Sequence, residues 1–147
     1  MKNIAPMTFH RKYALTLLLA VASLIAWPAM AEEEPEERGV TDYIAMEPAF
    51  VTHVGEPGNK VIYLKASVTL RASQETTRAA VQAHMPRLRH ELVMLFGEQT
   101  DVDQLTTQQG QQALRGEATQ RINAALEEQK TGERITGVLF TEFVVQR

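Results

Sequence analysis

The histidines and the acidic residues are the side chains of this sequence that could bind a metal or transfer protons. His84 and His90 are close in sequence, but they lie on opposite sides of Pro86 and lack the i, i+4 spacing of a metal pair on one helix. Asp101 and Asp103 are spaced like the first two ligands of a calcium loop, yet the glycine and the later ligands do not follow. We therefore expect no metal site, and we interpret both aspartates as helix caps or loop residues.

Other signatures of catalysis are also missing from the sequence. The 147 residues include no cysteine, which excludes disulfides, thiolate metal ligands and a thiol nucleophile. There is no glycine-rich phosphate loop and no serine in a nucleophile elbow, and no pair of carboxylates stands out among the 18 acidic residues. We predict a protein that is not an enzyme and that holds no cofactor.

Residues 1–31 have the pattern of an export signal, in which three basic residues precede an uncharged apolar run from Tyr13 to Ala31. In one interpretation this is a signal peptide cleaved after Ala29-Met30-Ala31. In the other it is a retained transmembrane anchor, because a helix of about 19 residues spans a hydrocarbon core of about 30 Å. In both, the basic flank stays in the cytoplasm and the rest of the chain faces the periplasm or the exterior.

The chain beyond Ala31 is acidic. Three of the 15 basic residues and none of the 18 acidic ones precede this point, which leaves a net charge of −6 beyond it. Such a balance does not suit a nucleic-acid-binding protein. Five of the glutamates lie between Glu32 and Glu37, so we expect residues 32–41 to form an extended acidic linker before a domain over residues 42–147.

Apolar residues recur with the period of a strand at both ends of this domain and with the period of a helix between them. Tyr43 to Val54 and Lys60 to Leu70 are predicted to form an antiparallel hairpin, with Pro48 marking a bulge or an edge. Ser73 is expected to cap the first helix, and Pro86 to divide that helical region in two. The predicted helices and last strand cover residues 74–85, 86–97, 107–129 and 134–146.

The order β-β-α-α-β predicts an α+β fold, a two-layer sandwich of a small antiparallel sheet with helices on one face. The last strand has apolar residues on both sides, with Leu139 and Phe143 on one and Phe140 on the other. Such a strand is central in its sheet or is buried against a partner.

Several segments, in order and at matching spacing, resemble the flagellar basal-body-associated FliL family. Val138 to Gln146 resembles the family's closing strand V-x-F-T-x-F-V-x-Q, and Gly110, Leu114-Arg115, Ile122-Asn123 and Leu126 resemble its helix G-x-x-x-L-R…I-N-x-x-L. Glu47-Pro48 with Phe50-Val51 resembles its first strand. The resemblance covers nearly all of residues 43–147.

The resemblance implies a stomatin-like domain in the periplasm, after an N-terminal apolar helix in the inner membrane. It also implies a ring of copies around the flagellar stator at the basal body, in support of rotation, torque, swarming and chemotactic motility. The family usually retains its transmembrane helix, whereas Ala29-Met30-Ala31 looks cleavable. The alternative is therefore a secreted periplasmic protein-binding domain without a motor role.

Contacts with protein partners are expected at exposed arginines, since arginine is enriched at interfaces. The candidate residues are Arg87, Arg89, Arg115 and Arg121. Leu114, Ile122, Phe140 and Phe143 are instead predicted to be core residues.

Overall fold

The computed structural model describes residues 40–58 and 60–147. The predicted export segment and nearly all of the predicted linker lie outside these residues. Within them no helix is both long enough and apolar enough to cross a bilayer. The compact unit Arg38–Arg147 contains β1 (Asp42–Ala45), β2 (Phe50–Val54), β3 (Ile62–Ala72), α2 (Glu75–Ala83), α3 (Met85–Gly97), α4 (Val102–Leu105), α5 (Gln108–Glu128) and β4 (Gly137–Gln146).

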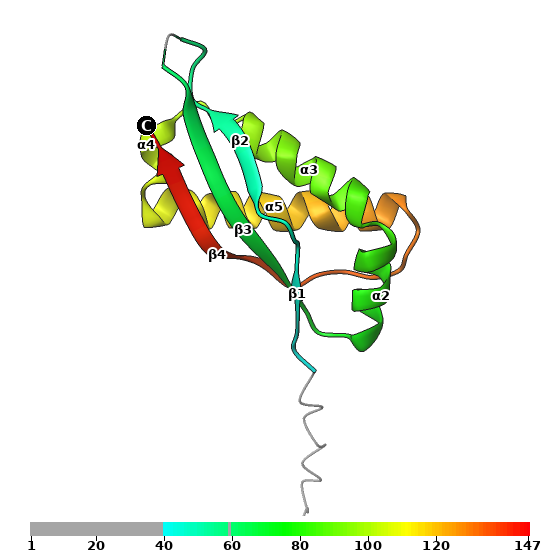
Figure 1. The fold of residues 1–147 in the computed structure, drawn as a ribbon. Helices are drawn as coiled ribbons and strands as arrows, with labels where there is room; N and C mark the ends of the chain where they lie inside the picture. Colours follow the sequence, from blue (N-terminus) through cyan, green and yellow to red (C-terminus); the bar gives the residue numbers. More distant parts are fainter. Residues whose placement is uncertain (1–39, 59) are drawn as a thin grey trace, which may run out of the picture. The chain divides into compact units, whose positions relative to one another are not determined.

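β3 is the centre of the sheet and pairs antiparallel with all three other strands (Figure 1). The predicted hairpin is confirmed, because β2 runs antiparallel to β3 with Val54 opposite Ile62. The predicted first strand, however, is divided into β1 and β2. The chain leaves the ladder between Met46 and Ala49, where Pro48 has no N–H to donate. β1 and β2 therefore share one side of β3, and β4 occupies the other.

The last strand differs from the prediction in two ways. It begins at Gly137 and pairs only with β3 within the described residues, so the central position that we considered for it is wrong. Ser67 lies opposite Glu142 and Val68 opposite Phe140, which leaves Thr141 as the extra residue of a bulge. The bulge shifts the alternation by one residue. Phe140 and Phe143 therefore lie on the same face, not on opposite faces as predicted.

The helix boundaries follow from local capping. Gln74 and not Ser73 is the N-cap of α2, and its side chain makes no capping hydrogen bond. Pro86 lies in the first turn of α3, where its missing N–H is not needed. The loop before α5 contains the short α4, whose N–H groups donate to the Asp101 side chain, so the expected capping role of this aspartate is confirmed. Thr107 caps α5 by accepting a hydrogen bond from the Gly110 N–H.

The core lies between the sheet and the helices, which cover one face only (Figure 1). Alternate residues of β3 from Leu64 to Ala72 point into it, as do the buried stripes of α3 and α5. Leu114 and Ile122 are buried as predicted, while Phe140 and Phe143 are partly buried against the core. The fold is thus the predicted α+β arrangement of a small antiparallel sheet with helices on one face.

Candidate partner-binding surfaces

Arg87 lies in the first turn of α3 and bridges two helices. Its Nη2 forms an ion pair with Glu91 at 2.9 Å and donates a hydrogen bond to Glu128, at the end of α5, at 3.0 Å. The pair with Glu91 has the i, i+4 spacing of a helix, which the sequence displays, whereas the pair with Glu128 joins residues far apart in the chain. Arg87 therefore holds the start of α3 against the end of α5.

Arg121 forms the second ionic link between the same helices. Its guanidinium donates to both carboxylate oxygens of Glu98, the C-cap of α3, and to Glu117 one turn earlier in α5. The hydrogen bonds with Glu98 lower the pKa of that carboxyl and raise the pKa of Arg121. All three side chains keep part of their surface in water, so we assign this cluster a modest contribution to stability.

Arg89 points toward the sheet and is half-buried. Its Nη1 donates to the Met46 carbonyl at 3.0 Å, and its guanidinium lies 4.1 Å from the centre of the Phe50 ring. Both contacts are at the break between β1 and β2, where backbone groups have left the ladder. Arg89 thus fixes this break against α3.

Arg115 lies on the opposite flank of α5 from Arg121. Two turns after it in α5, Asn123 is hydrogen-bonded to Ile135, just before β4, so this flank faces β4. Within the described residues Arg115 takes part in no ion pair. The four candidate arginines therefore do not form one site: two lie along the seam between α3 and α5, one contacts the sheet and one lies near β4.

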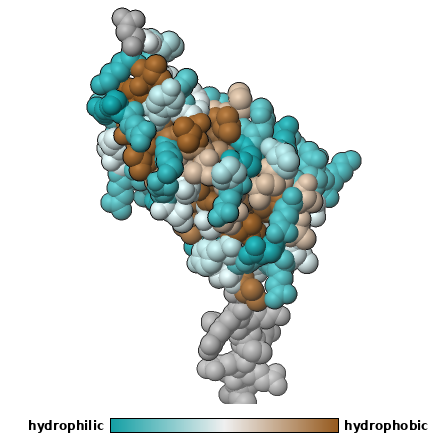
Figure 2. All heavy atoms as spheres, viewed as in Figure 1, coloured by the Kyte–Doolittle hydropathy of each residue, from teal (hydrophilic) through white to brown (hydrophobic). Residues whose placement is uncertain are grey.

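The sheet face that the helices leave uncovered is a second candidate surface, here called the outer sheet face. Lys65 at its centre donates to Glu142 at 2.9 Å, and Ser67 donates to the same carboxylate at 3.1 Å. These two donors lower the pKa of Glu142. Figure 2 looks onto this face and shows hydrophobic residues between hydrophilic ones. The exposed hydrophobic residues of this face are Tyr43, Val51, Tyr63 and Val144.

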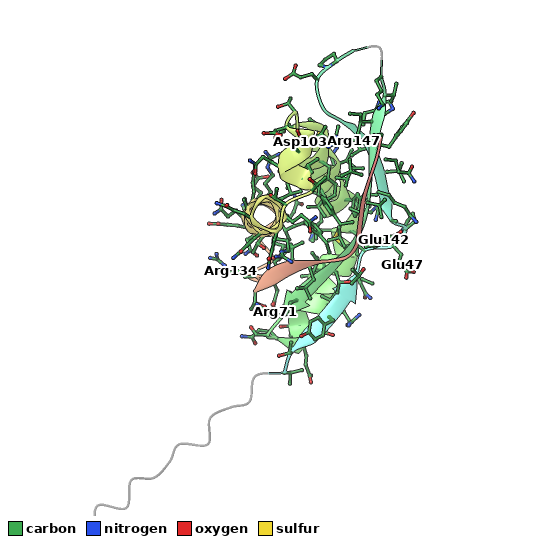
Figure 3. All side chains as sticks on the ribbon, turned by 90° about the vertical axis from the view of Figure 1, so that its left-hand side faces the viewer. Glu47, Arg71, Asp103, Arg134, Glu142 and Arg147 are labelled. Carbon is green, nitrogen blue, oxygen red and sulfur yellow. The ribbon has the colours of Figure 1, made fainter. Side chains whose placement is uncertain are left out.

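A hollow of about 670 Å³ interrupts the sheet where both flanking strands depart from β3. The break at Glu47 and Pro48 forms one wall, the bulge at Thr141 forms the other, and Ser67 to Thr69 form the floor. In Figure 3 Glu47 and Glu142 lie on the sheet side, away from the helices. The described residues contain no group of three or more histidine or acidic side chains that could hold a metal ion. Hydroxyl groups and one acid lie at the border of the hollow.

Comparison with known proteins identifies the family. The model of the flagellar basal body-associated protein FliL matches residues 43–146, which is nearly the whole described domain. The chain belongs to the FliL family.

Individual FliL proteins align with most of this chain at low sequence identity. The flagellar protein FliL of Escherichia coli (strain K12) is 27% identical over 118 residues, which cover 79% of this chain and 73% of that protein. The flagellar protein FliL of Aquifex aeolicus (strain VF5) is 28% identical over 112 residues, which cover 76% of this chain and 65% of that protein. These relatives indicate a protein associated with the flagellar basal body.

The residues by which the FliL resemblance is visible in the sequence mostly build the fold. Asn123 ties α5 to the chain before β4, and Glu47-Pro48 forms the break in the first strand. A Cβ on Gly110 would lie 2.0 Å from the Gln104 carbonyl oxygen, so only glycine fits there. Arg115 is the exception, because its side chain has no structural ion pair in the described part of the chain. The spacing of residues in the sequence did not distinguish Arg115 from the other candidate arginines, whereas the predicted two-layer fold already left one sheet face uncovered.

Proposed function

We propose that this FliL-family chain is a non-enzymatic accessory of the flagellar motor, which associates with the stator at the basal body and supports rotation, torque and swarming. The observation that carries the proposal is the family match over residues 43–146, which spans all strands and helices of the domain but β1's first residue. The uncovered outer sheet face supports a role in protein contacts, since exposed apolar residues of this kind mark interaction sites.

The proposed location is the periplasmic side of the inner membrane. It rests on the export pattern of residues 1–31, in which basic residues precede the apolar run. The domain associates with copies of itself through heterologous contacts that close into a ring. The membrane is a partner only if the N-terminal segment is retained.

Among the four arginines, Arg115 is the partner contact that we favour. Arg87, Arg89 and Arg121 already contact Glu128, Met46 and Glu98, and a partner would have to displace or share these contacts. Arg115 can meet a partner carboxylate without such an exchange.

The second candidate function is that of a free periplasmic protein-binding domain without a motor role, and the sequence Ala29-Met30-Ala31 favours it. Deletion of the gene separates the two. A motor accessory leaves cells with impaired swimming or swarming under load, restored by the full chain in trans. Normal swimming and swarming under load in the deletion strain contradict the motor function and leave the second candidate.

The mature N-terminus is determined by intact-mass measurement of the native protein in membrane and soluble periplasmic fractions. A membrane-bound chain that starts at Met1 supports a retained anchor. A soluble chain that starts at Glu32 shows that the leader is removed after Ala31, so that association with the motor depends on protein contacts alone.

A further inference from the structure

β4 leaves one long edge of the sheet without a neighbouring strand. Its ten residues pair with β3 on one side only within the described residues. The opposite edge is formed by strands of four and five residues with Pro48 between them, and short or interrupted strands are a common protection against pairing. β4 contains no lysine and no proline, and its protections of this kind are the bulge at Thr141 and one charged residue, Glu142, which is paired with Lys65.

Apolar side chains flank this edge on both faces of the sheet. On the helix side Phe140 and Phe143 stack with ring centres 4.9 Å apart and are only partly buried, although both pack against the core. On the outer sheet face Leu139 is partly exposed and Val144 is 41% exposed. Another strand beside β4 would cover apolar surface on both of its faces.

α5 lies beside this edge, on the helix-covered face of the sheet. It packs against β4 and runs in the opposite sense, because Asn123 contacts Ile135 before β4, whereas Asp103 before α5 pairs with Arg147 after β4. Figure 1 shows the first turns of α5 extending beyond β4, and Figure 3, which looks onto this edge, shows Asp103 and Arg147 together at its end. Arg115 lies on the flank of α5 that faces β4, about two turns before Asn123. Eight residues of helix correspond to about 12 Å, so the cation lies within the span of the open edge and not at its start.

We propose that β4 receives an additional strand from a protein partner. The partner supplies an extended segment with apolar side chains at alternate positions facing Phe140 and Phe143, and one carboxylate facing Arg115. Main-chain hydrogen bonds to the free edge give affinity, and the alternating side chains and the charge give specificity. This inference rests on the proposed function, which requires a protein partner. It adds the surface of this chain that the partner contacts and the chemistry of the partner's segment.

The positive charge of Arg115 on α5 argues against a second copy of β4 as the occupant. A two-fold axis between two antiparallel β4 strands would bring both α5 helices to the same side of the junction, with both Arg115 side chains under it. Like charges at such a junction are unfavourable, and a two-fold contact does not extend into a ring. An acidic extended segment satisfies the same cation.

Peptide selection on the immobilised full-length chain tests this proposal. The probe is a displayed library of random peptides about ten residues long, the length of β4. We expect enriched peptides with alternating apolar residues and one acid, and a synthetic copy of the best peptide should protect amides of β4 from hydrogen exchange. Peptides without this pattern, or protection confined to β2 or to the helices, would overturn the proposal.

Two valines provide a matched pair of variants, since Val51 of β2 and Val144 of β4 both lie opposite Lys65 and both are exposed. Val144→Lys places a charge on the proposed edge and should weaken peptide binding about tenfold or more, while Val51→Lys should leave it unchanged. Circular dichroism checks that both variants are folded. Equal binding by the two variants contradicts strand addition at β4.

The Arg115→Glu variant tests the charge. Repeating the selection on it should enrich basic residues in place of the acid at the same position of the alternating pattern. An unchanged acidic preference contradicts the role of Arg115, and self-association that Val144→Lys abolishes would show that the occupant is a second copy. These binding readouts do not depend on motility, so they can fail while the motor function stands, and the reverse also holds.

Discussion

Asn123 of α5 and Ile135 are joined by two hydrogen bonds, in which the Asn123 amide donates to the Ile135 carbonyl at 3.1 Å and accepts from the Ile135 N–H at 2.8 Å. Asn123 is partly buried and Ile135 is buried. The side chain thus replaces a strand neighbour for a residue that precedes β4 and has no ladder partner. This contact fixes where β4 starts relative to α5, and so sets the position of Arg115 beside the strand.

Asn123→Ala should lower the free energy of unfolding by about 1–3 kcal/mol, because it leaves the N–H and C=O of Ile135 without their partner. Chemical denaturation measures the change. Gln120→Ala is the control on the same helix, since Gln120 is exposed, and should change stability by less than about 0.5 kcal/mol. Similar small effects for both variants would show that the hydrogen bonds between Asn123 and Ile135 are not needed for the position of β4.

The two glycines of α5 should respond to alanine in opposite directions. Gly110→Ala places a Cβ against the Gln104 carbonyl and should destabilise the protein by about 1–3 kcal/mol, despite the better helix propensity of alanine. Gly116 has open space around the Cβ position, so Gly116→Ala should stabilise by about 0.5–1 kcal/mol. Thermal and urea unfolding of both variants check the signs, and stabilisation by Gly110→Ala would contradict the close contact.

Arg89 and Arg115 should separate stability from binding. Arg89→Met loses the hydrogen bond to Met46 and the contact with the Phe50 ring, and should cost about 1–2 kcal/mol of stability. Arg115→Met should change stability by less than about 0.5 kcal/mol, since Arg115 is outside the ion pairs of the described domain. Urea midpoints test this contrast, and a large loss in Arg115→Met would assign that residue a structural role.

The domain should lose stability as the pH falls below about 5. The pKa values of four carboxyls lie below their ordinary values because arginine, lysine or hydroxyl groups donate to them: Asp42, Glu98, Glu133 and Glu142. Since their pKa values are lower in the folded than in the unfolded chain, their stabilising effect is present above the ordinary values, 3.8 for Asp and 4.5 for Glu, and disappears as these groups are protonated.

Urea midpoints between pH 7 and pH 3 should therefore be constant at first and then fall. Glu133→Gln should make the fall shallower, because the Thr77 hydroxyl, which donates to Glu133 at 2.6 Å, stabilises the charged carboxylate more than the protonated acid, whereas a glutamine amide at this position does not titrate. Glu127→Gln, at an exposed position of α5, is the matched control. Midpoints that rise toward pH 3 would contradict the assigned contacts.

The sequence was sufficient to predict β3, α3 and α5, because their apolar residues recur with one clear period. It was not sufficient for the two places where the ladder is interrupted. Pro48 indicated an irregularity but not a division of the strand. The bulge at Thr141 was hidden because apolar residues occupy both sides of β4, so a shift of one residue leaves no mark in the pattern.

The candidate site was predictable only in part, for a similar reason. The i, i+4 pairs of Arg87 with Glu91 and of Arg121 with Glu117 are visible in the sequence. The links to Glu128 and Glu98 depend on the packing of α3 against α5, which a linear pattern does not give. The difference between Arg115 and the other arginines therefore emerged only from the fold.

The torque of single motors in a strain lacking this gene tests the central claim most directly. Beads attached to flagellar stubs, large enough to impose high load, report the torque, and the same strain carrying the full chain in trans is the control. The proposed motor function predicts lower torque at high load in the deletion strain and recovery in the control. Torque equal to that of the parent strain at every load would contradict it.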